Sequence, residues 1–345
     1  MTDEPFRLGT RGSALAQQQA RSVQEKLERR RNTVELVEVA TTGDRLEDEL
    51  IHRLGRTGAF VRDLDEHVIT GDLDAAVHSL KDMPTEMPSE LVVAAIPQRT
   101  VPNDVLVTPD GGTVDDLPDG ATIGTSSLRR RAQLLAVRPD LDVVPIRGNV
   151  DTRIEKLLGP HLRDERDAIE DEDERSAWVA ARSAIEQAAL ERESEEELDA
   201  LVLAAAGLER LGLIREVPTT RLPLEQFVPA PGQGAIAVTM VDGDTAETVH
   251  QRLDHPPSRV AATVERVLLS TLGGGCIAPI GIHAIVQGEV VHTRVAVHAA
   301  EGEESITTTR DLPVETHVDA AVDLANELAE QGAADMIEAA ARDNT

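Results

Sequence analysis

The sequence predicts an α/β protein in which short apolar strands alternate with amphipathic helices along most of the chain. Runs rich in Val, Ile and Leu recur between segments whose apolar residues are spaced as one face of a helix. The 345 residues, of which 41% are hydrophobic, are enough to bury substantial cores. This length predicts two or three domains.

The first predicted elements form one unit that ends near residue 96. Residues 6–9 predict a strand, and the spacing of Leu15, Val23 and Leu27 predicts a helix over residues 14–31. The other elements of this unit are a strand at 34–39, a helix at 60–69, and strands at 75–77 and 91–96.

A second unit begins after residues 97–102, a segment that starts and ends with proline. Residues 159–198 are dense in Asp and Glu. Within them, Trp178, Ile185 and Leu190 predict an amphipathic helix over residues 176–192, and the flanks predict a solvated surface insertion. The other elements of this unit are strands at 105–107, 121–124 and 141–146, a helix at 128–137, and a buried run at 200–206.

A third unit begins near Ser258. The same patterns predict a helix at 264–272, strands at 280–285 and 290–297, and a closing helix at 318–341. The chain therefore divides into three α/β parts.

The chain is strongly acidic, with 63 Asp and Glu residues against 34 Lys and Arg and a formal net charge of −29. This charge disfavours nucleic acid as a partner, because such binding depends on basic side chains. The acid excess and the scarcity of lysine are typical of proteins from very salty cytoplasm, where a Debye length of roughly 3 Å screens self-repulsion. No apolar run approaches 18 residues and no signal-like N-terminus is present, so a soluble cytoplasmic protein is expected.

Cys276 is the only cysteine, and it follows three glycines and precedes Pro279 in LGGGCIAPIG. A lone cysteine is often a small buried hydrophobe, but a core position gains nothing from a glycine run that clears one flank of side chains. The thiol has no partner for an internal disulfide, and no Cys or His stands at zinc-ligand spacing. What remains is a thiol that carries a group covalently or attacks one.

Several arginines stand in predicted strand-to-helix turns or first helical turns, which meet at the C-terminal edge of an α/β sheet, where ligands bind. Arginine matches carboxylate or phosphate groups in a bidentate manner, so the set predicts a ligand with several anionic groups. The alternative is surface arginines paired with the abundant acids; hydroxyls at Ser13, Ser126 and Ser127 in the same turns disfavour it. The arginines are Arg11, Arg129, Arg130, Arg131, Arg147, Arg153 and Arg210.

The segment HSLKDMP at 78–84 follows a predicted strand, and Pro84 prevents a long helix. Lys81 and Asp82 therefore stand at a strand end. As a surface ion pair, the two would contribute under about 1 kcal/mol. As functional groups, a carboxylate among cations is suited to stabilise a developing cation or to move protons.

Seven motifs, in this order, resemble the porphobilinogen deaminase family, also called the hydroxymethylbilane synthases. They are TRGS (10–13), HSLKDMP (78–84), GTSSLRR (124–130), RGNVDTR (147–153), LAAAGLERL (203–211), PGQGA (231–235) and LGGGCIAPIG (272–281). The resemblance implies a transferase of tetrapyrrole, porphyrin and heme biosynthesis that joins four porphobilinogen molecules head to tail, with loss of ammonia, into hydroxymethylbilane. It also implies a dipyrromethane cofactor bound through a thioether to Cys276.

The resemblance further implies roles for single residues. Asp82 matches the catalytic carboxylate, which stabilises positive charge on a pyrrole nitrogen. Each added unit brings an acetate and a propionate, which accounts for the basic residues as carboxylate clamps. The implied cofactor-binding residues are Cys276, Lys81, Ser13, Ser127, Arg129, Arg130 and Asp82. The implied substrate-binding residues are Arg11, Arg147, Arg153, Arg210, Gln19 and Phe60. The expected partner is porphobilinogen, with no metal, nucleic acid or membrane, and the chain is expected to be a monomer.

The resemblance implies three α/β domains, of which the first two are similar to the paired lobes of periplasmic binding proteins and the third, smaller one carries the cofactor cysteine. The active site is then expected between the two lobes. Residues 1–100 and 233–252 are expected to form domain 1, residues 101–230 domain 2 with the acidic insertion 159–198, and residues 256–345 domain 3.

The chain departs from the family pattern at two places. Thr57 stands where the family's mobile loop usually carries lysine, so Arg53 or Arg56 is expected to supply that charge, and the acidic insertion is longer than the usual connection. Two other classes stay open. A two-lobed anion-binding protein without chemistry would need neither Cys276 nor Asp82. A thiol-dependent acyl or redox enzyme would need a base, for which His283 is the only sequence-near candidate.

Overall fold

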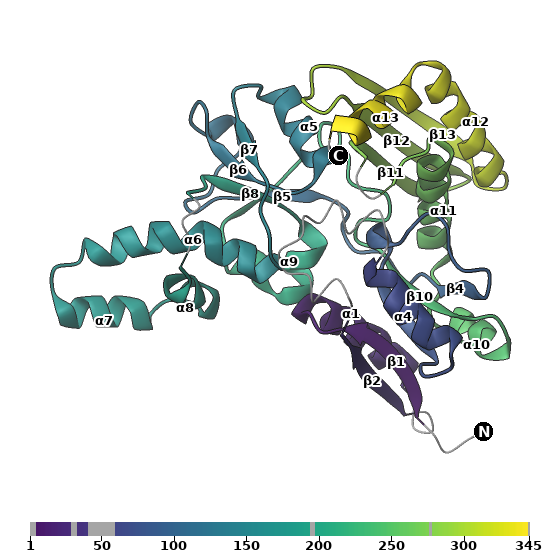
Figure 1. Ribbon diagram of the computed structural model, residues 1–345, viewed down its shortest axis with the longest axis horizontal. Coiled ribbons are helices and arrows are strands. Elements are labelled where there is room, and N and C mark those ends of the chain that lie inside the picture. The colour runs from purple at the N-terminus through teal and green to yellow at the C-terminus, as the bar shows by residue number, and fades with distance from the viewer. Residues whose placement is uncertain (1–4, 29–32, 41–58, 194–196, 276–277, 344–345) are drawn as a thin grey trace.

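The computed structural model describes residues 5–28, 33–40, 59–193, 197–275 and 278–343. These residues form three sheets flanked by helices, which confirms the α/β fold class (Figure 1). Within the described ranges, no helix is long and apolar enough to cross a membrane.

The first sheet has the strand order β2-β1-β3-β10-β4. The strands β1 (Phe6–Arg11), β2 (Val34–Val39) and β3 (Ala75–Ser79) are parallel, and β10 (Ile236–Val241) runs antiparallel between β3 and β4 (Leu91–Ala95). A late part of the chain therefore returns to complete the first sheet.

Helices cover both faces of this sheet. Helices α1 (Ala14–Leu27) and α10 (Asp244–Leu253) share one buried cluster with Leu8 of β1. Helix α4 (Ala59–Ile69) packs Leu64 in a second cluster on the other face. The core on this face of the first sheet therefore combines α1, from the start of the chain, with α10, which follows the returning strand β10.

The second sheet has the order β7-β6-β8-β5-β9. Its parallel strands β6 (Thr122–Gly124), β7 (Asp142–Val144) and β8 (Ala200–Ala204) adjoin β5 (Asp104–Val107), which runs antiparallel to β8 and to β9 (Thr219–Arg221).

One face of the second sheet is covered by α6 (Val150–Asp167), α8 (Ala184–Glu191) and α9 (Ala205–Leu211). Helix α5 (Leu128–Val137) packs on the other face, near the single-turn helix η2 (Val114–Asp116). The first turn of α5 follows directly from the end of β6, which is where three of the predicted site residues stand.

The third sheet is an antiparallel meander of β11 (Ile280–Gln287), β12 (Val290–His298) and β13 (Ser305–Pro313). Helices α11 (Pro256–Thr271), α12 (His317–Glu330) and α13 (Ala333–Asp343) bury a common apolar cluster against one of its faces. Figure 1 shows this sheet and α13 beside α5 of the second sheet.

Two segments connect the first and second sheets and run side by side. The N–H of Thr100 donates to the carbonyl of Gly234 at 3.2 Å. Gly234 has a φ of +84°, and a Cβ there would lie 2.9 Å from the carbonyl oxygens of Thr100 and Val101. This approach therefore requires glycine.

Most predicted elements are present, and the strand at 34–39 and the helix at 128–137 have the predicted bounds. The predicted helix 176–192 is wrong: it is two helices, α7 (Glu172–Ala180) and α8, because Ser183 caps the second one with a capping box. The predicted closing helix 318–341 is also two helices, since Gly332 between them adopts a φ of +97°.

Two further predictions need correction. The helix 14–31 ends at Leu27, with Glu28 already extended. The strand at 141–146 is confined to β7. The run 200–206 is buried except at half-buried Ala204, as expected, and it changes from strand to helix at Ala205. Strand β13 was not predicted, because its Thr- and charge-rich sequence lacks a clear apolar alternation.

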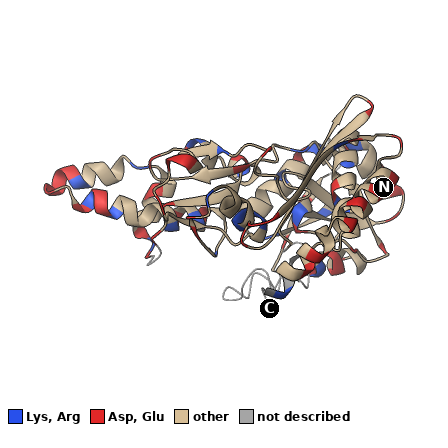
Figure 2. Cartoon of the chain, turned by 90° about the horizontal axis from the view of Figure 1, so that it is seen from above, with Lys and Arg blue, Asp and Glu red and all other residues tan. Residues whose placement is uncertain are grey.

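The acidic insertion forms a helical arm rather than a loop. Helix α6 continues through Pro160, and α7 buries none of its residues. Figure 2 shows acidic residues, coloured red on the ribbon, at the outer end of this arm, and the first turn of α7 carries Glu172, Asp173 and Glu174. The exposure of α7 confirms the solvated character predicted for this region. The division of the region into α6, α7 and α8 was not predicted.

Candidate active site

Two predicted site segments lie at the C-terminal ends of neighbouring parallel strands. Strand β1 ends at Arg11, and Ser13 caps α1 by accepting a backbone N–H at 3.3 Å. Strand β3 continues into the single-turn helix η1 (Leu80–Asp82), which carries Lys81 and Asp82. Because β1 and β3 are adjacent and parallel, the four residues share one edge of the first sheet.

The side chain of Asp82 is accessible, whereas the backbone of the two residues before it contacts another part of the chain. Its side chain is 56% exposed, and its Oδ1 lies 3.8 Å from Nζ of Lys81. Leu80 is buried, and its N–H donates to a carbonyl of the motif 231–235 at 3.1 Å. Gly232 of that motif has a φ of +75°, and a Cβ there would lie 3.1 Å from the backbone N of Lys81. The 231–235 motif therefore supports the segment that presents Asp82.

His78, in the same motif as Asp82, has a structural role. It is buried, and its Nε2 lies 3.0 Å from Oδ1 of Asp65 and 3.1 Å from Oγ1 of Thr239. These contacts join β3 to α4 and β10.

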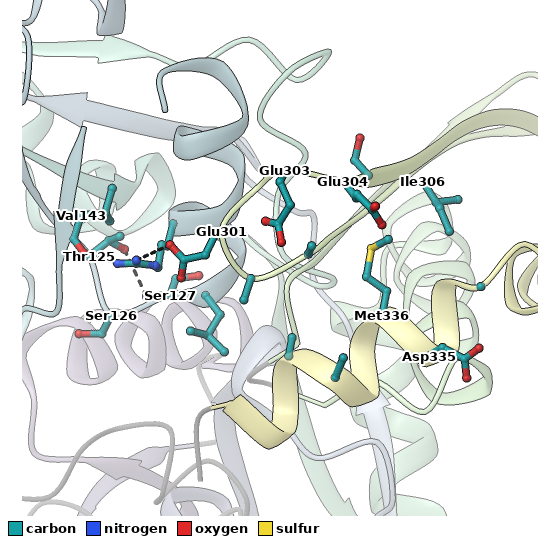
Figure 3. Close-up of a pocket in the computed structure, with 18 of the residues that line it drawn as sticks. Thr125, Ser126, Ser127, Val143, Glu301, Glu303, Glu304, Ile306, Asp335 and Met336 are labelled. Carbon is teal, nitrogen blue, oxygen red and sulfur yellow. Dashed lines mark hydrogen bonds and ion pairs between the residues drawn. The ribbon is translucent and has the colours of Figure 1, made fainter. Parts of the chain in front are cut away.

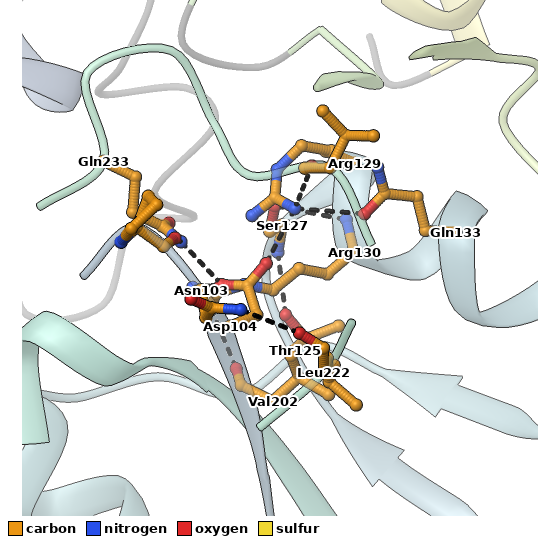
Figure 4. A network of polar contacts seen from close by, with 12 residues as sticks. Asn103, Asp104, Thr125, Ser127, Arg129, Arg130, Gln133, Val202, Leu222 and Gln233 are labelled. Atoms are coloured by element: carbon orange, nitrogen blue, oxygen red, sulfur yellow. Dashed lines mark hydrogen bonds and ion pairs between the residues drawn. The ribbon is translucent and has the colours of Figure 1, made fainter. Parts of the chain in front are cut away.

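The start of α5 carries three predicted residues around a buried carboxylate (Figure 4). Ser127 caps the helix by accepting the N–H of Arg130 at 3.4 Å. Arg130 donates to Asp104 through Nε at 3.0 Å and Nη2 at 2.8 Å, and Nη1 of Arg129 lies 2.7 Å from the other carboxylate oxygen. Burial would raise the pKa of Asp104, but the two guanidiniums hold it well below its usual range. Burial also lowers the pKa of Arg129 despite this carboxylate.

Carbonyl and amide groups complete this network. Nη1 of Arg130 donates to the carbonyl of Val202 at 2.8 Å, and Nη1 of Arg129 donates to that of Val228 at 2.9 Å. The amide of Gln233, in the segment that returns to the first sheet, donates to Asp104 at 3.0 Å. Two guanidiniums facing one carboxylate leave a net positive charge at the start of α5.

Arg153, near the start of α6, forms no ion pair with any described carboxylate. Its Nε donates to the carbonyl of Gly148 at 2.8 Å. Burial and the nearby charge of Arg130 lower the pKa of Arg153 to about 10. A desolvated guanidinium beside a second one would be stabilised by an anionic ligand.

Arg147 occupies a further strand-end position, whereas Arg210, expected in a strand-to-helix turn or first helical turn, lies in the last turn of α9. Nη2 of Arg210 donates to the carbonyl of Gly234 at 2.7 Å, and burial lowers its pKa. Arg147 follows β7 and lines a crevice of about 1110 Å³ together with Ser127 (Figure 3). The opposite wall belongs to the third sheet and α13 and carries Glu301, Glu303, Glu304 and Asp335. The crevice reaches neither Lys81 nor Asp82.

The first and second sheets approach each other at their helix starts. A Cβ on Gly207 of α9 would lie 3.7 Å from the side chain of Leu15 in α1 and 3.5 Å from that of Val150 in α6. Helices α1, α6 and α9 therefore converge around Gly207. This arrangement brings Ser13 of the first unit to two helices of the second unit that carry Arg153 and Arg210.

Some predicted residues are not placed. Cys276 and the loop 53–57 lie outside the described residues, as does the side chain of Phe60. Gln19 lies on the buried face of α1. A Cβ on Gly275, next to Cys276 in the chain, would meet nothing within 4 Å. In the described ranges, no group of His, Cys, Asp and Glu is arranged to hold a metal ion.

Sequence reasoning missed two residues of this site. Asp104 opens an otherwise apolar strand, DVLV, and such a polar residue in a buried run was the available signal. Gln233 stands in the motif PGQGA, which was named for the family resemblance and without a role for this amide.

Comparison with known proteins gives one family. Residues 6–186 and 174–249 match the model described as porphobilinogen deaminase, dipyromethane cofactor binding domain, and residues 260–331 match the porphobilinogen deaminase C-terminal domain. A probable porphobilinogen deaminase of Halobacterium salinarum is 47% identical over 390 aligned residues, covering 98% of each chain. The porphobilinogen deaminase of Rubrobacter xylanophilus is 42% identical, covering 86% of this chain and 85% of its own.

Solved structures with a similar arrangement include the methionine binding protein MetQ. It is 14% identical, covers 72% of this chain and 89% of its own, and has a TM-score of 0.35. A periplasmic substrate-binding protein of an ABC transporter from Coxiella burnetii is also 14% identical, covers 76% of this chain and 96% of its own, and has a TM-score of 0.39.

Proposed function

This chain belongs to the porphobilinogen deaminase family, and on that premise we propose how its own residues perform the family's reaction. The chain is a transferase of tetrapyrrole biosynthesis that condenses four porphobilinogen molecules head to tail, with loss of ammonia, into hydroxymethylbilane. Its cofactor is dipyrromethane, which when bound supplies the pyrrole carbon to which new units are added.

The residues at the site fit a group that carries acetate and propionate side chains. Arg153 is desolvated and has no described acidic partner, and Arg129 with Arg130 keeps a net positive charge after pairing with Asp104. Ligand carboxylates would compensate the charge of Arg153 and the excess positive charge of Arg129 and Arg130, because a guanidinium donates two parallel hydrogen bonds that match a carboxylate. The observation that carries the proposal is the motif 231–235, because Gly232 packs against the backbone that presents Asp82 while Gln233 binds the Asp104 that holds Arg129 and Arg130.

Asp82 is assigned the catalytic role. Its carboxylate is accessible at a strand end and lies beside the ammonium of Lys81, which holds it in place without covering it. From there it would accept a hydrogen bond from a pyrrole N–H of the substrate and stabilise the positive charge that develops on that nitrogen.

The binding roles are divided between the sheet edges. Ser127, Arg129, Arg130, Ser13 and Lys81 are assigned to the cofactor, with Asp104 as the residue that positions the two arginines. Incoming substrate is assigned to five further charged or polar residues on β1, α1, α6, α9 and the segment after β7, together with the aromatic residue at the second position of α4. These residues are Arg11, Arg147, Arg153, Arg210, Gln19 and Phe60. Cys276 is assigned as the point of covalent attachment, and the open flank of Gly275 supports that assignment.

The proposed domain division follows the sheets. Domain 1 comprises residues 1–100 and 233–252, domain 2 residues 101–230, and domain 3 residues 256–345. The return of β10 to the first sheet supports the split of domain 1. The chain is proposed to act as a monomer in a salty cytoplasm, a setting that its net charge of −29 supports.

Denaturing mass spectrometry of the intact protein tests this proposal. The unaltered chain should carry a mass excess of two linked pyrrole units, and Cys276→Ser should lack it. A bare polypeptide mass that persists after incubation with porphobilinogen would reject the proposal and favour an anion-binding protein without chemistry.

A further inference from the structure

We infer that the tip of the β12–β13 hairpin, residues 299–304, is a positioning element for the anion-binding start of α5, and that Gly302 is the residue that allows the close contact. The inference rests on the proposed function, because it concerns residues that the proposal places at the site. It assigns domain 3 a role in the geometry of the anion site, in addition to carrying Cys276.

The contact at Gly302 is made against the backbone of α5. Gly302 has a φ of +77°, and a Cβ there would lie 2.4 Å from the carbonyl oxygen of Ala132 and 2.5 Å from the N of Ala136. Real Cβ atoms essentially never come this close to backbone atoms, and backbone within a helix yields little. The hairpin tip therefore lies so close to the backbone of α5 that only glycine fits at position 302.

An ion pair flanks this contact. Nη2 of Arg131, in α5, donates to Oε2 of Glu301 at 2.7 Å (Figure 3). Nη1 of Arg131 also donates to the carbonyl of Val143 in β7. The tip thus contacts α5 through backbone packing at Gly302 and through a side chain that is itself anchored on the second sheet.

The hairpin is stiff enough to act as a brace. All nine residues of β12 pair with β13, and the loop is closed by an N–H···O=C bond from Ala299 to Glu304 at 2.9 Å. Nη2 of Arg294, further along β12, donates to the carbonyl of Glu225 at 2.6 Å. Two separated contacts with domain 2 fix the direction of the hairpin as well as its position.

The same hairpin also contacts the segment that follows Cys276. The N–H of His298, just before the tip, donates to the carbonyl of Pro279 at 3.1 Å, and Pro279 is three residues after Cys276 in the chain. The hairpin therefore connects the covalent attachment segment to α5, whose start presents Ser127, Arg129 and Arg130. A shift of the tip would move these carboxylate-binding groups and leave Asp82, on the first sheet, in place.

Two glycine substitutions test the inference. Gly302→Ala adds a methyl group against α5. Gly288→Ala, in the β11–β12 turn, is the matched control, because its φ of +62° gives similar backbone strain while its Cβ would meet nothing within 4 Å. Both full-length proteins are compared by steady-state kinetics with porphobilinogen and by amide hydrogen exchange over residues 128–137.

We expect Gly302→Ala to raise KM at least about threefold relative to Gly288→Ala, with kcat within about twofold, because ground-state and transition-state binding weaken together. Exchange over residues 128–137 should be faster in Gly302→Ala only. A Gly302→Ala protein that loses stability but keeps the KM and the exchange of the control would overturn the inference, since it would show a purely structural role.

Should Gly302→Ala fail to fold, Glu301→Arg decides the question, because Glu301 is 61% exposed and its replacement adds no backbone clash. At the lowest salt that keeps the fold, Glu301→Arg should raise KM and speed exchange in α5, and adding Arg131→Glu should restore both. Unchanged values would reject the inference. An unaltered chain that lacks deaminase activity would reject the proposed function instead, and the exchange comparison would still decide whether the tip braces α5.

Discussion

Asp104 determines how the arginines at the start of α5 are held. It is buried at 1% exposure and receives both guanidiniums together with the amide of Gln233. Without its charge, two buried cations would face each other with no compensation. Asp104 therefore stabilises the folded protein and also fixes the positions of Arg129 and Arg130 in the proposed anion site.

The first prediction concerns Asp104→Asn. Removing one partner of a buried charge pair leaves the other uncompensated, so the free energy of unfolding should fall by about 3–5 kcal/mol. Denaturant unfolding measures this loss. Asp311→Asn, which removes an exposed partner of His292, is the control and should change the free energy far less. Equal losses in the two variants would contradict the importance of the buried network.

The second prediction concerns the pH dependence of the same group. Because the pKa of Asp104 is held well below its usual range in the folded protein, the unfolded chain binds this proton more readily. The stability that Asp104 contributes is therefore present above about pH 4 and is lost as the pH falls toward the lower folded pKa. Unfolding curves from pH 6 to pH 3 should show this component in the unaltered chain. If Asp104→Asn shows the same slope, the assignment fails.

The third prediction concerns Asp82→Asn. The neutral amide keeps the shape of the side chain but removes the charge that stabilises a cationic pyrrole, so turnover should fall by a factor of about 10² or more. The dipyrromethane mass should remain, because Cys276 is unchanged. Asp72→Asn, in the turn before β3 and so at the opposite end of that strand from Asp82, is the control for the loss of an exposed carboxylate. Full turnover in Asp82→Asn would exclude the catalytic role.

At the scale of elements, helix caps explain where the predicted helices were wrong. Local apolar spacing runs across residues 176–192, but Ser183 and Glu186 form a capping box that starts a new helix. Asp171 caps α7 by accepting the N–H groups of Asp173 and Glu174. The two caps serve different helices, since α8 buries Ile185 and Ala189 whereas α7 buries none of its residues.

The fourth prediction compares these caps. Ser183→Ala should lower the free energy of global unfolding by about 1 kcal/mol, because α8 is part of the packed core of domain 2. Asp171→Ala should instead speed hydrogen exchange within α7 and leave global unfolding unchanged. Chemical denaturation and hydrogen exchange measured on both variants distinguish the outcomes. A global loss in Asp171→Ala would mean that the arm is coupled to the core.

At the scale of the whole molecule, the net charge of −29 sets the conditions under which the fold is stable. Asp and Glu residues recur along the arm and through the rest of the ribbon in Figure 2, and the repulsion among their charges opposes the compact state when ions are dilute. Salt at molar concentration shortens the screening length to roughly 3 Å.

The fifth prediction is that stability rises with salt. The melting temperature and the deaminase activity should both increase between 0.1 and 3 M KCl. The screening length is about 10 Å at the lower concentration and under about 3 Å at the higher one. Thermal unfolding with assay at each concentration measures this. Undiminished stability and activity without added salt would contradict the role assigned to surface charge.

Much of this protein follows from local sequence. Strands, helix starts and the residues that follow strand ends could be predicted, because apolar period and cap chemistry act over a few residues. The sequence therefore predicts sheet-edge positions for Arg11, Lys81, Asp82 and Ser127. The motifs indicated the family because each is a short continuous segment that can be recognised without knowledge of the tertiary structure.

Only the tertiary structure decided how these segments meet. The bond from Gln233 to Asp104 joins residues 129 positions apart, and that from Arg130 to Asp104 spans 26. The return of β10 to the first sheet and the contact of Gly302 with α5 likewise join segments that are distant in sequence. Such contacts depend on packing and desolvation in the folded chain, and a periodic pattern carries no information about which distant segment will supply the partner.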